Sequence, residues 1–364
     1  MKDVCDLIAA QDFDLSPWGS DETGPGVIAA MLAGNEVTSW ASVGRATIGV
    51  DADRLTPETV FYVASVSKQF TAACVTACEA DGLIDVDASI RDHLPELPVL
   101  FEPITLRHLL HHLGGLPHGG AAGVTAAPKG EGDWRDGLGL WDLIALLALE
   151  PGLLSAPGES YSYSNCGYWL LAAAVERASG ESLAAFARRR LFAPLGMVDS
   201  RFRDNPDTPQ PGLAPGHVRQ GESYTPIVTR FHGVGDGGLL TTVDDLARWD
   251  AFWAGGSSLG AGLLPRMLQQ GRRNDGAQLV YARGVSVRRH RGLRIISHGG
   301  SFLGYQSKLV RFPDQDFSIC ALANAGDLDL DGLCIALADR ALAGLADRHE
   351  PSWVETFRED ALAT

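Results

Sequence analysis

Lysine is scarce in this 364-residue chain, which contains only Lys2, Lys68, Lys129 and Lys308. Basic residues as a whole are outnumbered, since 30 Lys and Arg face 45 Asp and Glu and the formal net charge is −15. A surface with this charge repels phosphate backbones and anionic lipids. We therefore predict that neither nucleic acid nor a membrane surface is a partner.

Long apolar runs and cysteine clusters are also missing. The N-terminal stretch MKDVCDLIAAQDFDLSPWGSDETG is too polar for a signal peptide or a spanning helix, so we expect a cytoplasmic protein. The six cysteines are scattered, with no CxxC pair, which argues against a disulfide framework. Cys74 and Cys78 are one helical turn apart, as in some metal sites, but small buried thiols are the favoured interpretation.

Strand-like segments occur at both ends of the chain. GVIAAMLAG (26–34) and EVTSWASVG (36–44) flank a Gly34-Asn35 turn, which is typical of a β-hairpin. Further strands are expected near the other end at 277–290, 293–298, 305–313 and 316–324, followed by a helix over 330–348. This order predicts an α/β (α+β) fold, in which one antiparallel sheet is built from both ends of the chain and is covered by helices.

The middle of the chain is predicted to be mostly helical. A helix is expected to start near residue 65, and others at 105–113, 140–150 and 166–180. Two long Gly/Pro-rich loops, 118–139 and 203–226, are expected to act as lids because loops of this length are uncommon in compact domains. We expect a sheet lobe from about 25–64 and 275–345, and a helical lobe over about 83–200 with loops to 274. An N-terminal segment (1–24) and a C-terminal tail (346–364) complete the chain.

Ser65 and Lys68 stand out in FYVASVSKQFTAACVTACEADGL (61–83) because Lys68 occupies a position where the pattern asks for a core residue. Residues three apart share a helix face. Desolvation lowers the pKa of a lysine, so Lys68 could remove the proton of a serine nucleophile. The alternative is a helix cap beside a surface lysine.

A second polar group, Tyr163-Ser164-Asn165, precedes the helix at 166–180. A tyrosine beside an ammonium group can have its pKa lowered and act as a general acid or base. Asn165 offers both a donor and an acceptor, suited to holding Lys68 and a substrate amide. The alternatives are an interface aromatic for Tyr163 and a helix N-cap for Asn165.

A third group, His298-Gly299-Gly300-Ser301, is expected at the end of a strand. Glycines let a backbone approach a ligand closely. The backbone N–H groups of Ser65 and Ser301 could then form an oxyanion hole. The alternative is a glycine turn between strands.

Together the three groups resemble the serine β-lactamase and penicillin-binding-protein superfamily, with its S-x-x-K, Y-x-N and K/H-T/x-G motifs. ASVSKQFTA, ITLRHLLHHLGGLP, YSYSNCGYWLLAAAVERASG, LFAPLGM, GDGGLLTTVDDLARW and ISHGGSFLGY are similar to its class C β-lactamase-related branch. The resemblance covers about residues 25–345 and implies a β-lactamase/transpeptidase-like catalytic domain that uses no metal or organic cofactor. It implies the following roles: acylated nucleophile, Ser65; its partner, Lys68; general acid/base, Tyr163; substrate positioning, Asn165, His298, Gly299 and Gly300; oxyanion donors, the N–H groups of Ser65 and Ser301.

One departure from the family pattern affects the substrate. The third group reads HGG where the family often has KTG, so a largely neutral His298 replaces a cation that would hold a substrate carboxylate. We expect a serine hydrolase that cleaves an ester or amide of a small molecule or a D-amino-acid-containing peptide. The alternative is an intracellular transacylase that passes the acyl group to an amine or alcohol. A non-catalytic acyl-binding or sensor module is the third possibility.

Three other features are interpreted as structural. GSSLG (256–260) matches G-x-S-x-G, but a helix rather than a strand precedes Ser258. A histidine cluster, in which His108 and His112 are expected to share a helix face, lacks acidic residues at ligand spacing, so loop-stabilising or pocket-lining roles are favoured over a metal site. This cluster comprises His108, His111, His112 and His118. Cys166 is expected to be a packed thiol.

Overall fold

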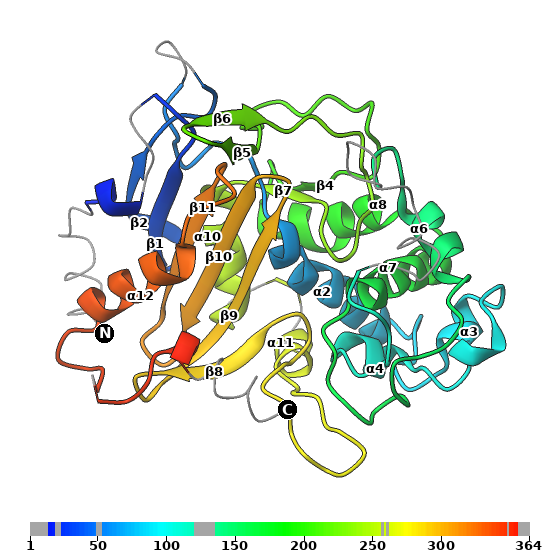
Figure 1. Ribbon diagram of the computed structural model, residues 1–364. Helices are drawn as coiled ribbons and strands as arrows, with labels where there is room; N and C mark the ends of the chain where they lie inside the picture. Colours follow the sequence, from blue (N-terminus) through cyan, green and yellow to red (C-terminus); the bar gives the residue numbers. More distant parts are fainter. Residues whose placement is uncertain are drawn as a thin grey trace.

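A six-stranded antiparallel sheet forms the centre of the computed structural model (Figure 1), which describes residues 14–18, 23–48, 53–119, 135–255, 258–259, 262–347 and 349–355. Its strands, in spatial order, are β2 (Glu36–Val43), β1 (Val27–Ala33), β11 (Phe317–Ala323), β10 (Tyr305–Phe312), β9 (Leu293–Phe302) and β8 (Ser286–His290). The predicted sheet from both ends of the chain is confirmed, since β1 pairs with β11 in the register Val27↔Ala323.

The first hairpin turns where the sequence predicts. Gly34 and Asn35 both have positive φ, 60° and 70°, which is the backbone of a two-residue type I′ turn. Glycine and asparagine tolerate this left-handed region better than other residues. The turn therefore sets the register of β1 against β2 next to the turn, and an irregularity between Met31 and Leu32 shifts it further along.

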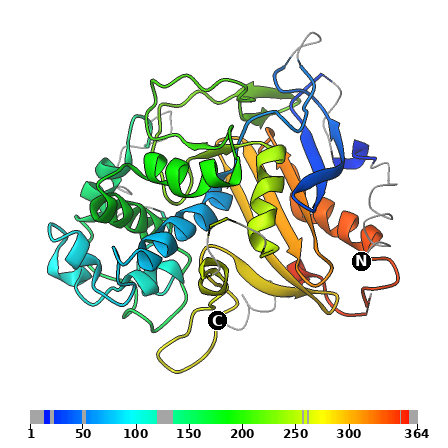
Figure 2. The ribbon, with the colours of Figure 1, turned by 180° about the vertical axis from the view of Figure 1, so that it is seen from behind.

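Helices cover both faces of the sheet. Side chains of β1 alternate between the two cores: Ile28 and Ala30 belong to one, and Val27 and Ala29 to the other. Helix α12 (Leu330–Ala341) packs on one face, and α10 (Val243–Trp253) packs on the other, as the two opposite views show (Figures 1 and 2). Because both faces are covered, all seven residues of β1 are buried.

The second lobe is mostly helical, as predicted. Helix α2 (Lys68–Ala80) packs against α7 (Asn165–Ser179) and leads from the sheet into this lobe. Short helices and turns surround the pair: η2 (Ala64–Ser67), α3 (Ile90–His93), η3 (Val99–Phe101), α4 (Leu106–Leu110), α6 (Leu140–Leu147), α8 (Leu183–Ala187), η4 (Arg188–Phe192) and α9 (Ala193–Leu195).

The remaining elements connect the two lobes or lie at their edges. They are η1 (Ser16–Trp18), α11 (Leu263–Met267), a small sheet of β3 (Phe61–Tyr62), β7 (Leu239–Thr241) and β4 (Arg201–Phe202), and a hairpin of β5 (His217–Gln220) and β6 (Ser223–Pro226). The observed mixed α/β architecture confirms the predicted fold class.

Three sequence predictions need correction. The strand expected at 277–290 begins only at Ser286, because residues 271–281 fold back on themselves through backbone hydrogen bonds such as Leu279 N–H to Gly271 O (2.8 Å). The last helix ends at Ala341 rather than 348. The second half of the expected lid at 203–226 is the β5–β6 hairpin, which is fixed to the main sheet because the His217 N–H donates to Asn324 O at 2.9 Å. Most of the other expected lid, 120–134, lies outside the described residues.

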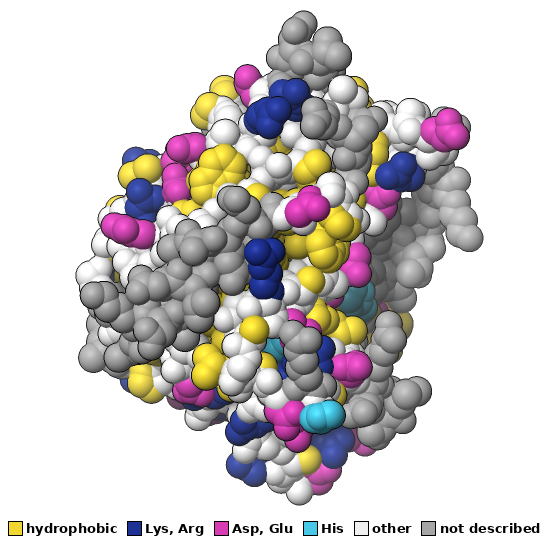
Figure 3. All heavy atoms as spheres, turned by 90° about the vertical axis from the view of Figure 1, so that its left-hand side faces the viewer, with side chains coloured by type: hydrophobic (Ala, Val, Ile, Leu, Met, Phe, Trp, Pro, Cys, Tyr) yellow, Lys and Arg dark blue, Asp and Glu magenta, His cyan; other side chains and the backbone are white. Residues whose placement is uncertain are grey.

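The surface carries charges of both signs. Figure 3, which faces the left-hand side of Figure 1, shows acidic, basic and hydrophobic side chains interspersed wherever described residues are visible. Among the helices of the described residues, none has the length and apolarity needed to cross a membrane.

Candidate active site

Ser65 lies on the 3-10 turn η2, which directly precedes α2. The prediction that Ser65 lies inside the α-helix itself is therefore wrong. The preceding residue, Ala64, has φ +45°, a left-handed backbone that is unfavourable for alanine. Such strain persists only where the surrounding structure enforces it, and it is common at functional sites. Ser65 is half-buried, so its hydroxyl remains within reach of a ligand.

Lys68 is completely buried and donates three hydrogen bonds. Its Nζ lies 3.1 Å from Ser65 Oγ, 2.8 Å from Asn165 Oδ1 and 2.7 Å from the backbone oxygen of Asp236. Burial lowers the pKa of Lys68 to about 8, although the nearby Asp236 carboxylate opposes this shift. The predicted contact with Ser65 and the predicted desolvation of the lysine are both confirmed.

Tyr163 lies against the same pair. Lys68 Nζ is 4.9 Å from the centroid of the Tyr163 ring, and the Tyr163 side chain hydrogen-bonds to Ser65. The prediction that its pKa is lowered is wrong: burial raises the pKa of Tyr163, and the hydrogen bond from Ser65 only partly offsets this effect. Tyr163 is therefore a protonated phenol that can donate a proton at neutral pH.

Asn165 is the first residue of α7, and its side chain accepts the Lys68 hydrogen bond, as predicted. The alternative interpretation of Asn165 as the helix N-cap is wrong, because Ser164 is the cap and accepts from the Gly167 N–H at 3.2 Å. The cap residue thus frees the Asn165 side chain to contact the lysine.

The third group lies within β9 and not in a turn. The turn of this hairpin is Leu303-Gly304, so the glycine-turn interpretation of Gly299 and Gly300 is wrong. A Cβ at position 300 would lie 2.5 Å from Val63 O and 2.8 Å from Ser65 N. Only glycine therefore lets this strand approach the serine so closely.

Among the residues that the structure describes, no strand pairs with the edge of β9 beside Ser65. β8 pairs with β9 only as far as Ser286↔Ser297. In a two-residue hairpin the closing pair, here Phe302↔Tyr305, is hydrogen bonded, and such pairs then alternate along the strands. Gly299 and Ser301 therefore direct their backbone N–H and C=O groups away from β10, toward the edge where Ser65 lies.

His298 is held as a neutral ring. Its Nδ1 lies 2.6 Å from Gly299 O and its Nε2 lies 3.1 Å from the Tyr281 hydroxyl. Because a carbonyl can only accept, Nδ1 carries the proton and Nε2 accepts from Tyr281. Burial and the Lys68 charge lower the pKa of His298 to about 3. The predicted neutral histidine is confirmed.

The sequence reasoning missed Asp236 as a neighbour of the site, whereas His112 belongs to the cluster for which it predicted loop-stabilising or pocket-lining roles. Asp236, between Gly235 and Gly237, accepts from Lys68 through its backbone and from the Trp169 indole N–H through its carboxylate at 2.7 Å. His112 packs against Tyr163 with ring centroids 4.3 Å apart. The sequence does contain a signal for Asp236, because in GDGGLLTT this charged residue stands within a cluster of glycines just before an apolar run.

The histidine cluster divides between different surroundings. His108 accepts from the Thr105 N–H and caps α4, whereas His118 donates to the Tyr163 backbone oxygen at 3.0 Å. His108 and His112 do not share a helix face, because α4 ends at Leu110 and His112 has φ +58°. His111 is buried between Arg107 O and Gln269 O.

The other interpretations as structural residues hold. Ser258 lies away from these groups and donates to Pro194 O at 3.0 Å. Cys166, Cys74 and Cys78 are buried in the core. These thiols are therefore packing residues, as expected.

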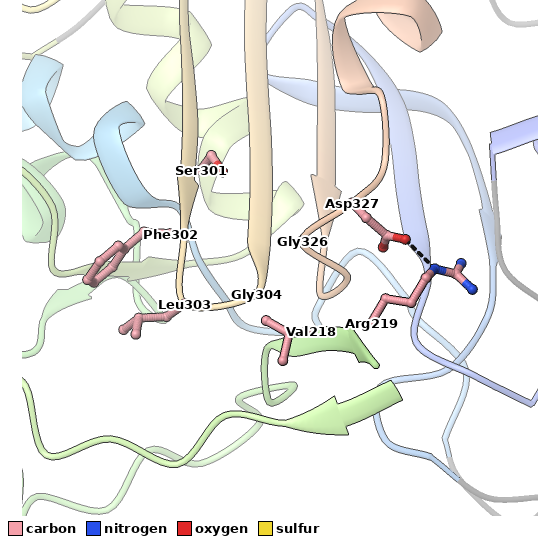
Figure 4. Close-up of a pocket in the computed structure, with 8 residues that line it drawn as sticks. All are labelled: Val218, Arg219, Ser301, Phe302, Leu303, Gly304, Gly326 and Asp327. Atoms are coloured by element: carbon pink, nitrogen blue, oxygen red, sulfur yellow. Dashed lines mark hydrogen bonds and ion pairs between the residues drawn. The ribbon is translucent and has the colours of Figure 1, made fainter. Parts of the chain in front are cut away.

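A cavity of about 260 Å³ adjoins Ser301 (Figure 4). Its walls come from β5, the β9–β10 turn and the segment after β11: Val218, Arg219, Ser301, Phe302, Leu303, Gly304, Gly326 and Asp327. At one end Arg219 Nε pairs with Asp327 at 2.5 Å. The cavity thus extends from the end of the β9–β10 hairpin to a surface ion pair.

Comparison with known proteins identifies the family of this chain. The profile of the Beta-lactamase family matches residues 19–342. The chain belongs to this family. Its fold is also that of a D-amino acid amidase from Ochrobactrum anthropi SV3 complexed with L-phenylalanine, with a TM-score of 0.71, 23% identity, and coverage of 93% of this chain and 97% of that one.

Curated relatives include two kinds of enzyme or binding protein. A D-aminopeptidase of Brucella anthropi is 28% identical over 83% of this chain and 56% of its own length. Penicillin-binding protein 4* of Bacillus subtilis is 29% identical over 80% of this chain and 66% of its own length. The β-lactamase-family chain described here therefore spans less than two thirds of the length of these relatives.

Proposed function

We propose that this chain is a serine hydrolase that cleaves the amide or ester bond of a small amino-acid-derived substrate through an acyl-enzyme on Ser65. The observation that carries the proposal is the Lys68 Nζ, which is completely buried, has a pKa of about 8 and lies 3.1 Å from Ser65 Oγ. A lysine with these properties is neutral often enough near neutral pH to accept the serine proton.

In the acylation step, neutral Lys68 takes the proton of Ser65 and Oγ adds to the substrate carbonyl carbon. The backbone N–H groups of Ser65 and Ser301 donate to the oxygen that becomes negative, and Gly300 permits their close approach. Asn165 holds Lys68 in place through the 2.8 Å hydrogen bond.

Tyr163 then donates its proton to the leaving group as the bond to the carbonyl carbon breaks. Its high pKa keeps it protonated until that step, and the ammonium of Lys68 can return the proton to it. Water attacks the acyl-serine by the reverse sequence of proton transfers. His298, Gly299 and Gly300 shape the side of the site on which the substrate lies.

The substrate class is proposed from chemistry and from likeness. A neutral His298 offers no charge to hold a substrate carboxylate, which disfavours substrates that depend on such a contact. The names of the D-aminopeptidase and of the D-amino acid amidase point to amides of D-amino acids or short D-peptides. We therefore propose D-amino acid amides and short D-peptides, which should be cleaved in preference to their L-enantiomers.

A serine-reactive phosphonate tests the nucleophile. The intact mass of the wild type should increase by one adduct. The matched control Ser258→Ala, at the unrelated G-x-S-x-G sequence, should show the same increase because it leaves Ser65 in place. The increase should be lost in Ser65→Ala. Labelling that persists in Ser65→Ala would overturn the proposal.

Hydrolysis and acyl transfer are separated by adding an acceptor. With a D-amino acid ester as donor and increasing concentrations of an amine, a hydrolase keeps forming the free acid, whereas a transacylase diverts product to the amide. Product analysis by mass spectrometry measures this partition. A product ratio dominated by the amide at low amine concentration would replace the hydrolase proposal with the transfer reaction.

A further inference from the structure

We propose that the side-chain carboxylate of Asp236 binds the ammonium group of an amino-acid-derived substrate. This inference rests on the proposed function and assigns a charge-recognition site to it. A free amino group would thereby become a requirement for good substrates.

The backbone places Asp236 beside the reacting atoms. Its carbonyl oxygen lies 2.7 Å from Lys68 Nζ, which in turn lies 3.1 Å from Ser65 Oγ. The flanking Gly235 has φ +112° and contacts the backbone of Tyr168 on α7. The turn that carries Asp236 therefore lies between α2 and α7. Only Lys68 thus stands between the Asp236 backbone and the Ser65 hydroxyl.

One carboxylate oxygen is fixed and the other is available. Oδ1 accepts from the Trp169 indole at 2.7 Å, and Trp169 follows Asn165 by one helical turn on α7. Within the described part of the chain no hydrogen bond reaches Oδ2, and no Lys or Arg forms an ion pair with the group. Because Asp236 is only half-buried, Oδ2 can accept from a ligand.

The charge of this carboxylate acts on the site itself. It raises the pKa values of Lys68, Tyr163 and Tyr62, which surround Ser65. An α-ammonium group is separated from the scissile carbonyl carbon by a single carbon atom, so a substrate bound for attack by Ser65 brings its positive charge into this neighbourhood. A carboxylate with one orienting partner and one unused oxygen is the protein group that suits an ammonium.

Binding there would also favour the reaction. A substrate cation on Asp236 neutralises the charge that keeps Lys68 protonated, so more of the lysine is in the neutral form that accepts the Ser65 proton. Substrates without the ammonium lack both the contact and this assistance.

Three p-nitroanilides that differ only at the α position test the site: D-alanine p-nitroanilide, N-acetyl-D-alanine p-nitroanilide and propionic acid p-nitroanilide. In the wild type the free-amine substrate should have a kcat/KM larger by roughly 10- to 100-fold, the range expected for one charge-assisted hydrogen bond. Asp236→Asn keeps an acceptor for Trp169 but removes the charge, and should reduce this ratio to near one, mainly through KM. Phosphonate labelling of Ser65 checks that the variant retains a folded site.

The outcomes separate this site from the proposed function. Equal kcat/KM for all three substrates in the wild type would overturn the ammonium site, whatever the variant does. A uniform loss with all three substrates in Asp236→Asn, with the ratio unchanged, would overturn it as well and leave Asp236 as a partner of Lys68 alone. No turnover of any substrate together with no labelling of Ser65 would remove the proposed function itself.

Discussion

At the scale of single residues, the site depends on a lysine that the fold deprives of water. Lys68 has no exposed surface, and its three acceptors are the Ser65 hydroxyl, the Asn165 amide oxygen and a backbone carbonyl. All three acceptors are uncharged, so they stabilise the ammonium less than a carboxylate at hydrogen-bond distance would. Burial therefore dominates and lowers the pKa of the lysine, which suits it to the proposed role of base.

This balance predicts the pH dependence of activity. Because only neutral Lys68 can accept the Ser65 proton, kcat/KM for an N-acetylated substrate, which has no amino group that titrates in this range, should rise with pH and reach half its maximum near pH 8. Well below that midpoint it should fall about tenfold per pH unit. His298, with a pKa of about 3, and Tyr163, whose pKa is raised, should not contribute between about pH 6 and pH 9. A profile that is flat across this range would contradict the assignment of Lys68 as base.

A substitution of Asp236 provides a second test of the pKa of Lys68. Its carboxylate raises the pKa of Lys68, so Asp236→Asn should move the midpoint of the profile to lower pH. Lys68→Arg, in contrast, should abolish nearly all activity and with it the rise of kcat/KM with pH, since a guanidinium does not lose its proton in this range. An unmoved midpoint in Asp236→Asn would show that the carboxylate does not act on the lysine.

At the scale of elements, the site is assembled where a strand edge meets a helix start. The 3-10 turn η2 and β9 are far apart in sequence, and Ser307 of β10 joins them by donating to Val63 O at 2.7 Å. The absence of a Cβ at Gly300 lets the strand pass close to the Ser65 amide. The spacing of the two proposed oxyanion donors therefore depends on the packing of these two elements.

Substitution of the two neighbouring glycines tests this packing. Gly300→Ala should lower kcat by about 100-fold or more, because the added methyl group pushes β9 away from Val63 and Ser65 and misplaces an oxyanion donor. Gly299→Ala should be much milder, since its Cβ would meet Lys308 Cδ at an ordinary 3.5 Å on the other face of the sheet. Steady-state kinetics with one ester substrate compares the pair. Equal losses in both variants would show that the close approach at Gly300 is not the cause.

At the scale of the whole molecule, a buried ion pair ties a covering helix to the sheet. Arg311 of β10 donates to Asp250 of α10 at 2.6 Å, and Ser318 of β11 donates to the same carboxylate. Arg311 and Asp250 are each only 3% exposed. A charge in such a place is tolerated because its partner is fixed by the packing around it.

Removing one member of this pair should cost stability. Asp250→Asn removes the buried counter-ion of Arg311 and leaves only the exposed Asp316 paired with it. The free energy of unfolding should therefore fall by about 2–4 kcal/mol, somewhat less than for a buried charge with no remaining partner. The matched control, Asp314→Asn, breaks the exposed pair between Arg294 and Asp314 and should change it by less than about 1 kcal/mol. Urea unfolding followed by circular dichroism measures both. A loss in Asp250→Asn no larger than in the control would mean that the buried pair does not stabilise the fold.

The sequence by itself determined which residues make up the candidate site and the order of the elements along the chain. The Gly34-Asn35 turn, the strands at both ends and the polar groups around Ser65, Tyr163 and His298 follow from local rules of turn formation and of acid–base chemistry. Such rules concern neighbours in the chain, so they remain valid before the fold is known.

Only the tertiary structure decided how those groups are tuned. The high pKa of Tyr163, the neutral tautomer of His298 and the position of Asp236 next to Lys68 all depend on burial and on contacts between segments distant in sequence. The packing of the His112 ring against Tyr163 is a further example, because it depends on the left-handed backbone of His112 just after α4. Desolvation and charge act through space, and a linear pattern does not contain those distances.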